Sequence, residues 1–216
     1  QAYKITNANF GKILNKDQKY VFFPLQVQPE YASNILAPMW VNSQNMVETI
    51  AKSIPSDWIV YVKEHPAMLS DRVRPKNFYE DLKKIPNVVF APTYFKTFNI
   101  IKNSEMVIVQ SNNSVAFDAI VLDKPVIEFR KNTWSLLELS KVSSDTEMLS
   151  KDIIEEIARI KNISKSEKER RIKCFIDSIH NFSFNLKYIK QAFYNEVGSD
   201  KEYKDCGKEM ADFFIK

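Results

Sequence analysis

Short apolar segments alternate with amphipathic ones over the first 130 residues of the chain. The apolar segments are rich in β-branched and aromatic residues and are apolar on both faces, which is typical of strands buried in a parallel sheet. They occupy residues 19–25, 58–62, 87–91, 106–110 and 125–129. Helical segments are predicted between them, at residues 42–54, 78–85, 93–103 and 115–122. This alternation predicts βαβ units, and therefore an α/β fold with a doubly wound parallel sheet.

The pattern changes after residue 129, where only helices are predicted. Helices are expected at residues 145–160, 164–180 and 185–197. We therefore expect three parts: an N-terminal segment or linker at 1–18, a Rossmann-like domain at 19–140, and additional C-terminal helices at 141–216 that pack on it.

The composition is ordinary for a globular protein, with 44% hydrophobic and 27% charged residues among 216. The net charge of +4 is mild and no basic stripe with interleaved aromatic residues is present, so no nucleic acid partner is expected. A weak peripheral attraction to an anionic membrane surface remains compatible with this charge. No apolar run approaches the ~18 residues of a membrane span. The expected location is the cytoplasm, including the inner face of the cytoplasmic membrane.

Cysteine and glycine content limits the chemistry. Cys174 and Cys206 lack the spacing of metal ligands and form no CxxC pair, so two reduced thiols are expected. The three glycines form neither a GxGxxG nor a Walker A loop, which excludes those two phosphate-binding motifs. A phosphate site in this chain must therefore use side chains and helix N-termini.

Candidate binding residues follow the strands, because ligands of open parallel sheets bind beyond the carboxyl ends of the strands. His65 follows the second strand, within Lys63-Glu64-His65-Pro66. One interpretation is a histidine held at the strand end by a backbone carbonyl. The other is a hydrogen-bond donor to a phosphate, with Lys63 supplying charge. A metal site is not expected, because the only other histidine, His180, does not pair with it in a metal-binding spacing.

The stretch Ser111-Asn112-Asn113-Ser114 follows the fourth strand and precedes a predicted helix. Helix N-termini carry unpaired backbone N–H groups and a partial positive charge. These residues either only cap the helix and turn the chain, or also donate to an anion. Asp118 lies one turn into the helix, where interaction with the helix dipole is enough to explain a carboxylate.

The loop after the first strand contains Gln26, Gln28 and Glu30, with Pro24 and Pro29 beside them. Proline stiffens a loop, which suits either a binding edge or an ordinary tight connection.

Glu128 ends the fifth predicted strand. Two interpretations are open: its carboxylate reaches a ligand beyond the strand end, or it forms an ion pair with Arg130.

Three motifs occur in a definite order: FPLQVQPE (Phe23–Glu30), VKEHP (Val62–Pro66) and SNNSVAFDAIVLDKPVI (Ser111–Ile127). Together they resemble the capsule polysaccharide biosynthesis family, which includes the Kdo transferases that build the lipid linker of bacterial capsules. The resemblance covers roughly residues 19–135. The first two motifs are fairly specific. The chain also resembles teichoic-acid polymerases that use CDP-glycerol, and bacterial sialyltransferases have a similar pair of motifs.

The resemblance implies the C-terminal, nucleotide-sugar-binding half of a GT-B glycosyltransferase. Its donor would be a CMP-activated sugar such as CMP-Kdo, used in bacterial capsule or surface polysaccharide biosynthesis without a metal or other cofactor. The donor-binding residues it implies are Gln26, Lys63, His65, Pro66, Ser111, Asn112, Asn113, Ser114 and Asp118. His65 and Glu30 are the candidates for catalysis. The implied acceptor is a glycan or glycolipid.

The chain departs from the family at two points. Asn112-Asn113 stands where the family often has a threonine-glycine pair, although asparagine tolerates left-handed backbone better than most residues. Nothing before residue 19 could supply the second Rossmann-like domain that GT-B enzymes use for the acceptor. That N-terminal acceptor domain is therefore expected in a longer protein or on another polypeptide.

Two other functions stay open. A CDP-glycerol-type phosphotransferase would break a phosphoanhydride rather than a glycosidic bond at a similar edge. A nucleotide-sugar-binding module without activity of its own would bind CMP and need a partner domain.

Overall fold

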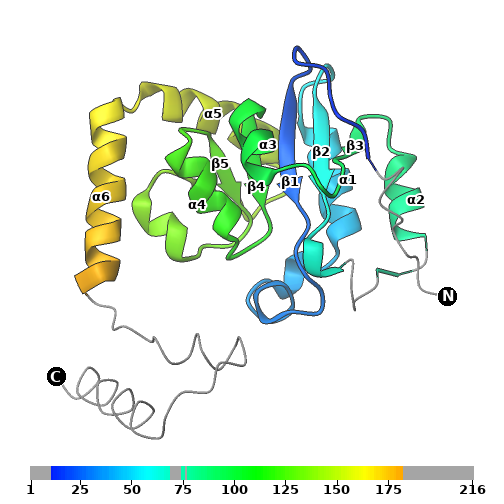
Figure 1. Ribbon diagram of the computed structural model, residues 1–216, viewed down its shortest axis with the longest axis horizontal. Helices are drawn as coiled ribbons and strands as arrows, with labels where there is room; N and C mark the ends of the chain where they lie inside the picture. Colours follow the sequence, from blue (N-terminus) through cyan, green and yellow to red (C-terminus); the bar gives the residue numbers. More distant parts are fainter. Residues whose placement is uncertain (1–10, 69–73, 76, 182–216) are drawn as a thin grey trace, which may run out of the picture. The chain divides into compact units, whose positions relative to one another are not determined.

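The computed structural model describes residues 11–68, 74–75 and 77–181. Its centre is a six-stranded sheet with the strand order β3-β2-β1-β4-β5-β6, in which every neighbouring pair is parallel (Figure 1). The order reverses between β1 and β4, which is the arrangement of a doubly wound Rossmann-like sheet. The predicted fold class is confirmed.

All five predicted strands are present, each within one residue of its predicted ends. They are β1 (Tyr20–Pro24), β2 (Ile59–Lys63), β3 (Val88–Phe90), β4 (Met106–Val109) and β5 (Val126–Glu128). The sixth strand, β6 (Lys141–Val142), was not predicted. Two residues at the sheet edge are too short a run for a periodic pattern to detect.

Helices cover both faces of the sheet (Figure 1). One face packs against α1 (Ser43–Ser53), α2 (Phe78–Lys83) and α5 (Leu149–Asn162) in a single apolar cluster. The other face packs against α3 (Thr97–Asn103) and α4 (Ser114–Val121). Adjacent residues of a strand point to opposite faces, and Phe22 and Phe23 of β1 are both fully buried. The central strand is therefore apolar throughout because both faces are covered.

Several short helical turns connect these elements and were not predicted. A π-helical turn spans Tyr31–Ile35, and 3₁₀ turns span Pro38–Trp40, Pro66–Met68 and Thr133–Leu137. Two predicted helices begin four residues later than expected, α3 at Thr97 and α5 at Leu149. Neither start has a side-chain cap, and hydrophobic periodicity does not fix the ends of an element.

The last described helix is α6 (Lys165–Asn181), close to its predicted range. Its residues from Glu169 onward belong to a second compact unit, whereas residues up to Lys168 belong to the first. The helix predicted at 185–197 lies outside the described residues, as does Cys206, while Cys174 is an exposed free thiol on α6. The division at residues 18 and 140 stays a prediction.

Within the described residues, no helix is both long enough and apolar enough to span a bilayer.

Candidate active site

The loops after β1 and β4 lie side by side because the strand order reverses between these two strands. Gln26 follows β1 and Ser111 follows β4, and both are buried. The Ser111 hydroxyl lies 3.1 Å from Gln26 Oε1 and 2.8 Å from the carbonyl oxygen of Ala32, so it can donate its proton to either acceptor. Two residues that are 85 positions apart in sequence thus meet at the edge where ligands of such sheets bind.

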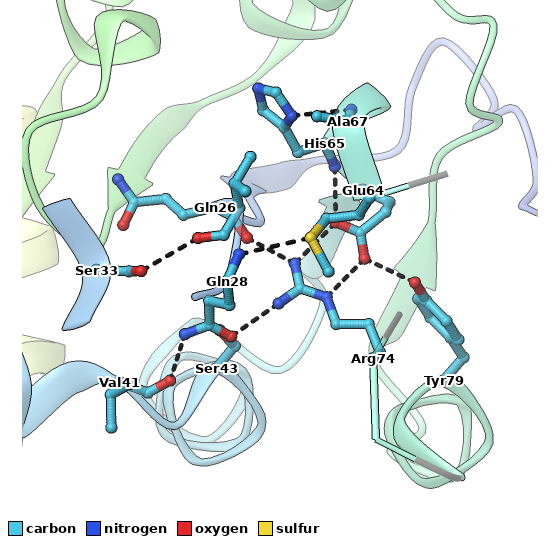
Figure 2. Close-up of polar contacts among 12 residues, drawn as sticks. Gln26, Gln28, Ser33, Val41, Ser43, Glu64, His65, Ala67, Arg74 and Tyr79 are labelled. Atoms are coloured by element: carbon cyan, nitrogen blue, oxygen red, sulfur yellow. Dashed lines mark hydrogen bonds and ion pairs between the residues drawn. The ribbon is translucent and has the colours of Figure 1, made fainter. Parts of the chain in front are cut away.

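His65 is exposed at the carboxyl end of β2, where the sequence predicted it. Its Nδ1 accepts a hydrogen bond of 3.1 Å from the backbone N–H of Ala67 (Figure 2). An imidazole nitrogen that accepts cannot carry a proton, so the neutral ring has its proton on Nε2. The ring points away from Arg74 in Figure 2. His65 therefore presents an Nε2–H donor on the exposed side of the strand end.

Glu64, beside His65, is a buried carboxylate that four donors satisfy (Figure 2). Arg74 donates to both of its oxygens, from Nε and Nη2, each at 2.8 Å. The Tyr79 hydroxyl donates at 2.8 Å and the backbone N–H of His65 at 2.7 Å. Burial and the neighbouring Glu64 charge both raise the pKa of Tyr79, so this hydroxyl stays protonated and able to donate. The glutamate holds the backbone of His65 in place.

Arg74 also joins this strand end to the loop after β1. Its Nη2 donates to the carbonyl oxygen of Gln26 and its Nη1 to Oε1 of Gln28, both at 2.7 Å. Gln28 in turn donates from Nε2 to the carbonyl oxygen of Val41 at 2.6 Å. The loops after β1 and β2 are thus linked through one buried guanidinium.

Sequence reasoning did not single out Arg74 or Tyr79 and treated Glu64 only as a nearby acid. Arg74 belongs to no motif, and its partners Gln26 and Gln28 lie 48 and 46 positions away in sequence. The available signal was the glutamate inside the VKEHP motif, because a carboxylate directly after a buried strand requires a partner.

Lys63 is the last residue of β2 and is mostly buried. Burial lowers the pKa of its ammonium group below the ordinary lysine value of 10.5, partly offset by the charge of Glu64. Its carbonyl oxygen accepts the backbone N–H of Leu25 at 2.9 Å. Pro66 begins the 3₁₀ turn that supplies Ala67 to the His65 ring. Both residues therefore lie beside His65 at the same strand end.

The Ser111–Ser114 stretch divides into inner and outer residues. Ser111 is fully buried, whereas Asn112 and Ser114 are exposed. Asn113 caps α4, its side chain accepting from the backbone N–H of Val115 at 3.0 Å. Neither asparagine is among the described residues with a positive φ, and φ of Asn113 is −126°. The turn thus forms without the left-handed backbone that asparagine would tolerate.

Gln110 lies directly before Ser111 and is also buried. Its Nε2 donates to the carbonyl oxygen of Trp40 at 2.5 Å. Its Oε1 is buried and has no hydrogen-bond donor among the residues that the structure describes. The strand end therefore holds an acceptor that a water or a ligand hydroxyl could satisfy.

Glu30 and Asp118 are both exposed. The backbone N–H of Glu30 donates to Oδ1 of Asn34 at 3.1 Å, at the start of the π-helical turn. Asp118 lies in the second turn of α4. Within the described part of the chain, no recorded contact joins either carboxylate to His65, Gln26 or Ser111.

Glu128 does not pair with Arg130, so that interpretation is wrong. The carboxylate is fully buried and accepts hydrogen bonds from Asn132 Nδ2 and from the hydroxyls of Ser135 and Ser140. Burial raises its pKa above the ordinary value of 4.5, against the effect of these three donors. Three neutral donors thus hold the loop after β5 against the end of this strand. Arg130 itself is exposed.

Taken together, the candidate donors lie at the ends of two strands of the sheet: the Nε2–H of His65 and Lys63 at the end of β2, and the first turn of α4 after β4. Donors of these kinds suit an anionic ligand. The described residues contain no group of three or more metal-ligating side chains.

Comparison with known protein families gives one match. A family model described as capsule polysaccharide biosynthesis protein matches residues 1–151, which is well over half of the chain. Comparison with curated proteins finds no match.

Several solved structures have a similar fold. Anabaena Alr3699/HepE, solved with UDP-glucose, has a TM-score of 0.50 at 12% identity over 76% of this chain and 48% of its own. Methanocaldococcus jannaschii UDP-GlcNAc 2-epimerase, solved with UDP-GlcNAc and UDP, gives 0.49 at 20% identity over 74% and 45%. Thermosulfurimonas dismutans KpsC, a beta Kdo 2,4 transferase, gives 0.48 at 15% identity over 73% and 47%. The chain spans about half the length of these structures.

Proposed function

The chain belongs to the capsule polysaccharide biosynthesis family, and we propose that it is the donor-binding half of a glycosyltransferase that uses a nucleotide-activated sugar. The proposed donor is a CMP-sugar such as CMP-Kdo. The proposed acceptor is a glycan or glycolipid of a bacterial capsule or surface polysaccharide.

The observation that carries this proposal is the arrangement of His65. Its Nδ1 is occupied by the Ala67 N–H, so its one ring proton is on Nε2 and is available to a ligand. The ring lies at the carboxyl edge of a parallel sheet, where nucleotides bind in folds of this kind. A solved neighbour with this fold, HepE, was obtained with UDP-glucose, which supports a nucleotide sugar as the ligand class.

The proposed reaction breaks the bond between the sugar and the donor phosphate. Negative charge develops on the phosphate as this bond breaks, and donors aimed at that charge lower the barrier. Nε2–H of His65, the Lys63 ammonium group and the α4 N-terminus are the proposed donors. Ser111 would not contact the phosphate, because its hydroxyl is buried and hydrogen-bonded to Gln26 or Ala32. Its proposed role is to hold the loop that contains Gln26 in place.

The acceptor hydroxyl must lose a proton to a base. Glu30 is the candidate in this chain, because its carboxylate is exposed on the loop after β1. The proposed arrangement places the principal base and the acceptor site on an N-terminal acceptor domain outside this chain. The reaction would then take place in the cytoplasm, with the assembled enzyme at the inner face of the membrane when its acceptor is a glycolipid.

The test is isothermal titration calorimetry of the full chain with CMP, with UMP and UDP as comparisons. We expect saturable binding that is strongest for CMP. His65→Ala should weaken CMP binding about tenfold or more, the size of one lost hydrogen bond to a charged group. His65→Gln should retain part of the affinity, because the glutamine Nε2 can supply a donor near the same place.

Lys52→Ala is the matched surface control. Lys52 is exposed near the C-terminal end of α1, which lies at the opposite edge of the sheet from His65. This variant should bind CMP as the native chain does. Equal affinity of the native chain and His65→Ala would contradict the proposal.

Titration with intact donors, together with a turnover assay, separates the other functions that the sequence left open. Preference for CDP-glycerol over CMP-Kdo and CMP-sialic acid would indicate a phosphotransferase. CMP binding without donor turnover, even when acceptor and acceptor domain are supplied, would indicate a binding module.

A further inference from the structure

We infer that Arg74 is a positioning residue that fixes the tautomer and placement of His65 and holds the donor-site loops after β1 and β2 together. This inference rests on the proposed function, because it concerns the same donor site. It assigns a role to a residue outside all three sequence motifs.

Arg74 is built into the protein interior. Its side chain is 1% exposed and that of its partner Glu64 is 0% exposed. The guanidinium uses four of its five N–H groups: two on the Glu64 carboxylate, one on the Gln26 carbonyl and one on the Gln28 amide oxygen. Its central carbon also lies 5.0 Å from the ring centroid of Phe78. Four of its five N–H groups and one of its faces are therefore in contact with named partners.

The connection from Arg74 to His65 passes through Glu64. The Oε1 atom of Glu64 accepts both the Arg74 Nη2 donor and the backbone N–H of His65. The position of the His65 backbone therefore depends on where Arg74 holds the Glu64 carboxylate. From that position Nδ1 meets the Ala67 N–H, which leaves the ring proton on Nε2. Movement of the carboxylate would displace His65 from Ala67.

A second connection runs to the loop after β1. Arg74 holds the Gln26 carbonyl, and the side chain of Gln26 lies against Ser111 at the end of β4. One guanidinium therefore links the ends of β2 and β1 directly, and that of β4 through Gln26. A lysine cannot replace it, because an ammonium group has three N–H donors and lacks the planar fork that grips two carboxylate oxygens.

The test compares Arg74→Lys with the native full chain by two measurements. The first is the ¹⁵N spectrum of the histidine rings at about pH 8.5, where histidine is ordinarily neutral. The chain has two histidines, and the spectrum of His65→Ala identifies which signals belong to His65. The second measurement is the Kd for CMP by calorimetry.

In the native chain we expect a single His65 tautomer with the proton on Nε2. In Arg74→Lys we expect a mixture of both tautomers and a CMP Kd raised about tenfold, as one charged hydrogen bond is displaced. Circular dichroism and the melting temperature establish that the variant is folded. Arg74→Lys keeps the positive charge beside Glu64, which is why it is preferred to alanine.

Arg159→Lys is the matched control. Arg159 also grips a fully buried glutamate with two N–H groups, at 2.7 and 2.8 Å from the Glu156 oxygens, and donates to the Glu138 carbonyl. The Arg159 side chain is 39% exposed, so the Arg159–Glu156 pair is less buried than the Arg74–Glu64 pair. Arg159→Lys should lower the stability of the fold at most, and the His65 tautomer and the CMP Kd should remain native.

The outcomes separate this inference from the proposed function. If His65→Ala leaves CMP binding unchanged, the proposed function itself fails. If His65→Ala weakens binding while folded Arg74→Lys keeps the single tautomer and the native Kd, the positioning role is wrong. The same holds if Arg159→Lys alters both measurements as much as Arg74→Lys does.

Discussion

At the scale of single residues, the contact of the His65 ring differs from the carbonyl contact that one interpretation required, and phosphate binding by this ring stays a prediction. A histidine held at a strand end by a backbone carbonyl would donate from its ring. Here the ring instead accepts from a backbone N–H, which directs the remaining donor outward. The candidate residues could be found from sequence because they directly follow predicted strands. Arg74 could not, because its role depends on contacts across 46 and 48 sequence positions.

Lys63 gives the pH dependence expected of donor binding. Burial lowers its pKa, so the ammonium group loses its charge at a lower pH than an exposed lysine does. In the proposed site the charged form binds phosphate, so the affinity for CMP should be present at about pH 7.5 and fall as the pH rises toward about 10. The phosphate monoester of CMP is doubly ionised over this range, since its second pKa is about 6.

Lys63→Arg is the informative variant, because guanidinium stays charged throughout this range. Calorimetry with CMP between pH 7.5 and about 10 should show a falling affinity for the native chain and a flatter profile for Lys63→Arg. If the CMP affinity falls by the same amount in the native chain and in Lys63→Arg, Lys63 does not bind the phosphate.

At the scale of elements, the apolar strands were predictable because both faces of the sheet are covered and their sequences are continuously apolar. The N-terminus of α4 was also predictable, because Asn113 caps it as its residue type indicates. The π-helical turn at Tyr31–Ile35 was not. It is held by contacts such as that of the Ser33 hydroxyl with the Val27 carbonyl at 3.1 Å, which no periodic pattern contains.

Two asparagine caps allow the role of the α4 N-terminus to be measured. Asn42 caps α1 by accepting from the backbone N–H groups of Gln44 and Asn45, and Asn113 caps α4. Replacing either by alanine should lower the free energy of unfolding by about 1 kcal/mol in urea titration. Only Asn113→Ala should also weaken CMP binding, by about two- to fivefold, because the charge interaction at that helix end is disturbed.

This comparison has a clear negative result. If both variants are destabilised and both bind CMP with native affinity, α4 contributes nothing to donor binding and its N-terminal residues act as a cap alone.

At the scale of the whole molecule, the strand order explains why residues of three distant motifs lie near one another. The motifs follow β1, β2 and β4, which are neighbours in the sheet although β3 separates them in sequence. Local patterns predicted a parallel sheet but not this order, since the order depends on which strands pair. The pairing brings Gln26 to Ser111 and, through Arg74, to Glu64. The candidate site therefore depends on the pairing of the strands more than on any one motif.

Whether His65 binds the donor phosphate is tested most directly by following its ring nitrogens while CMP is added to the full chain. We expect a saturable change at Nε2 with the same Kd as calorimetry, while Nδ1 remains the acceptor of the Ala67 N–H. His65 signals that stay unchanged at every CMP concentration would contradict the proposal that this histidine binds the donor phosphate.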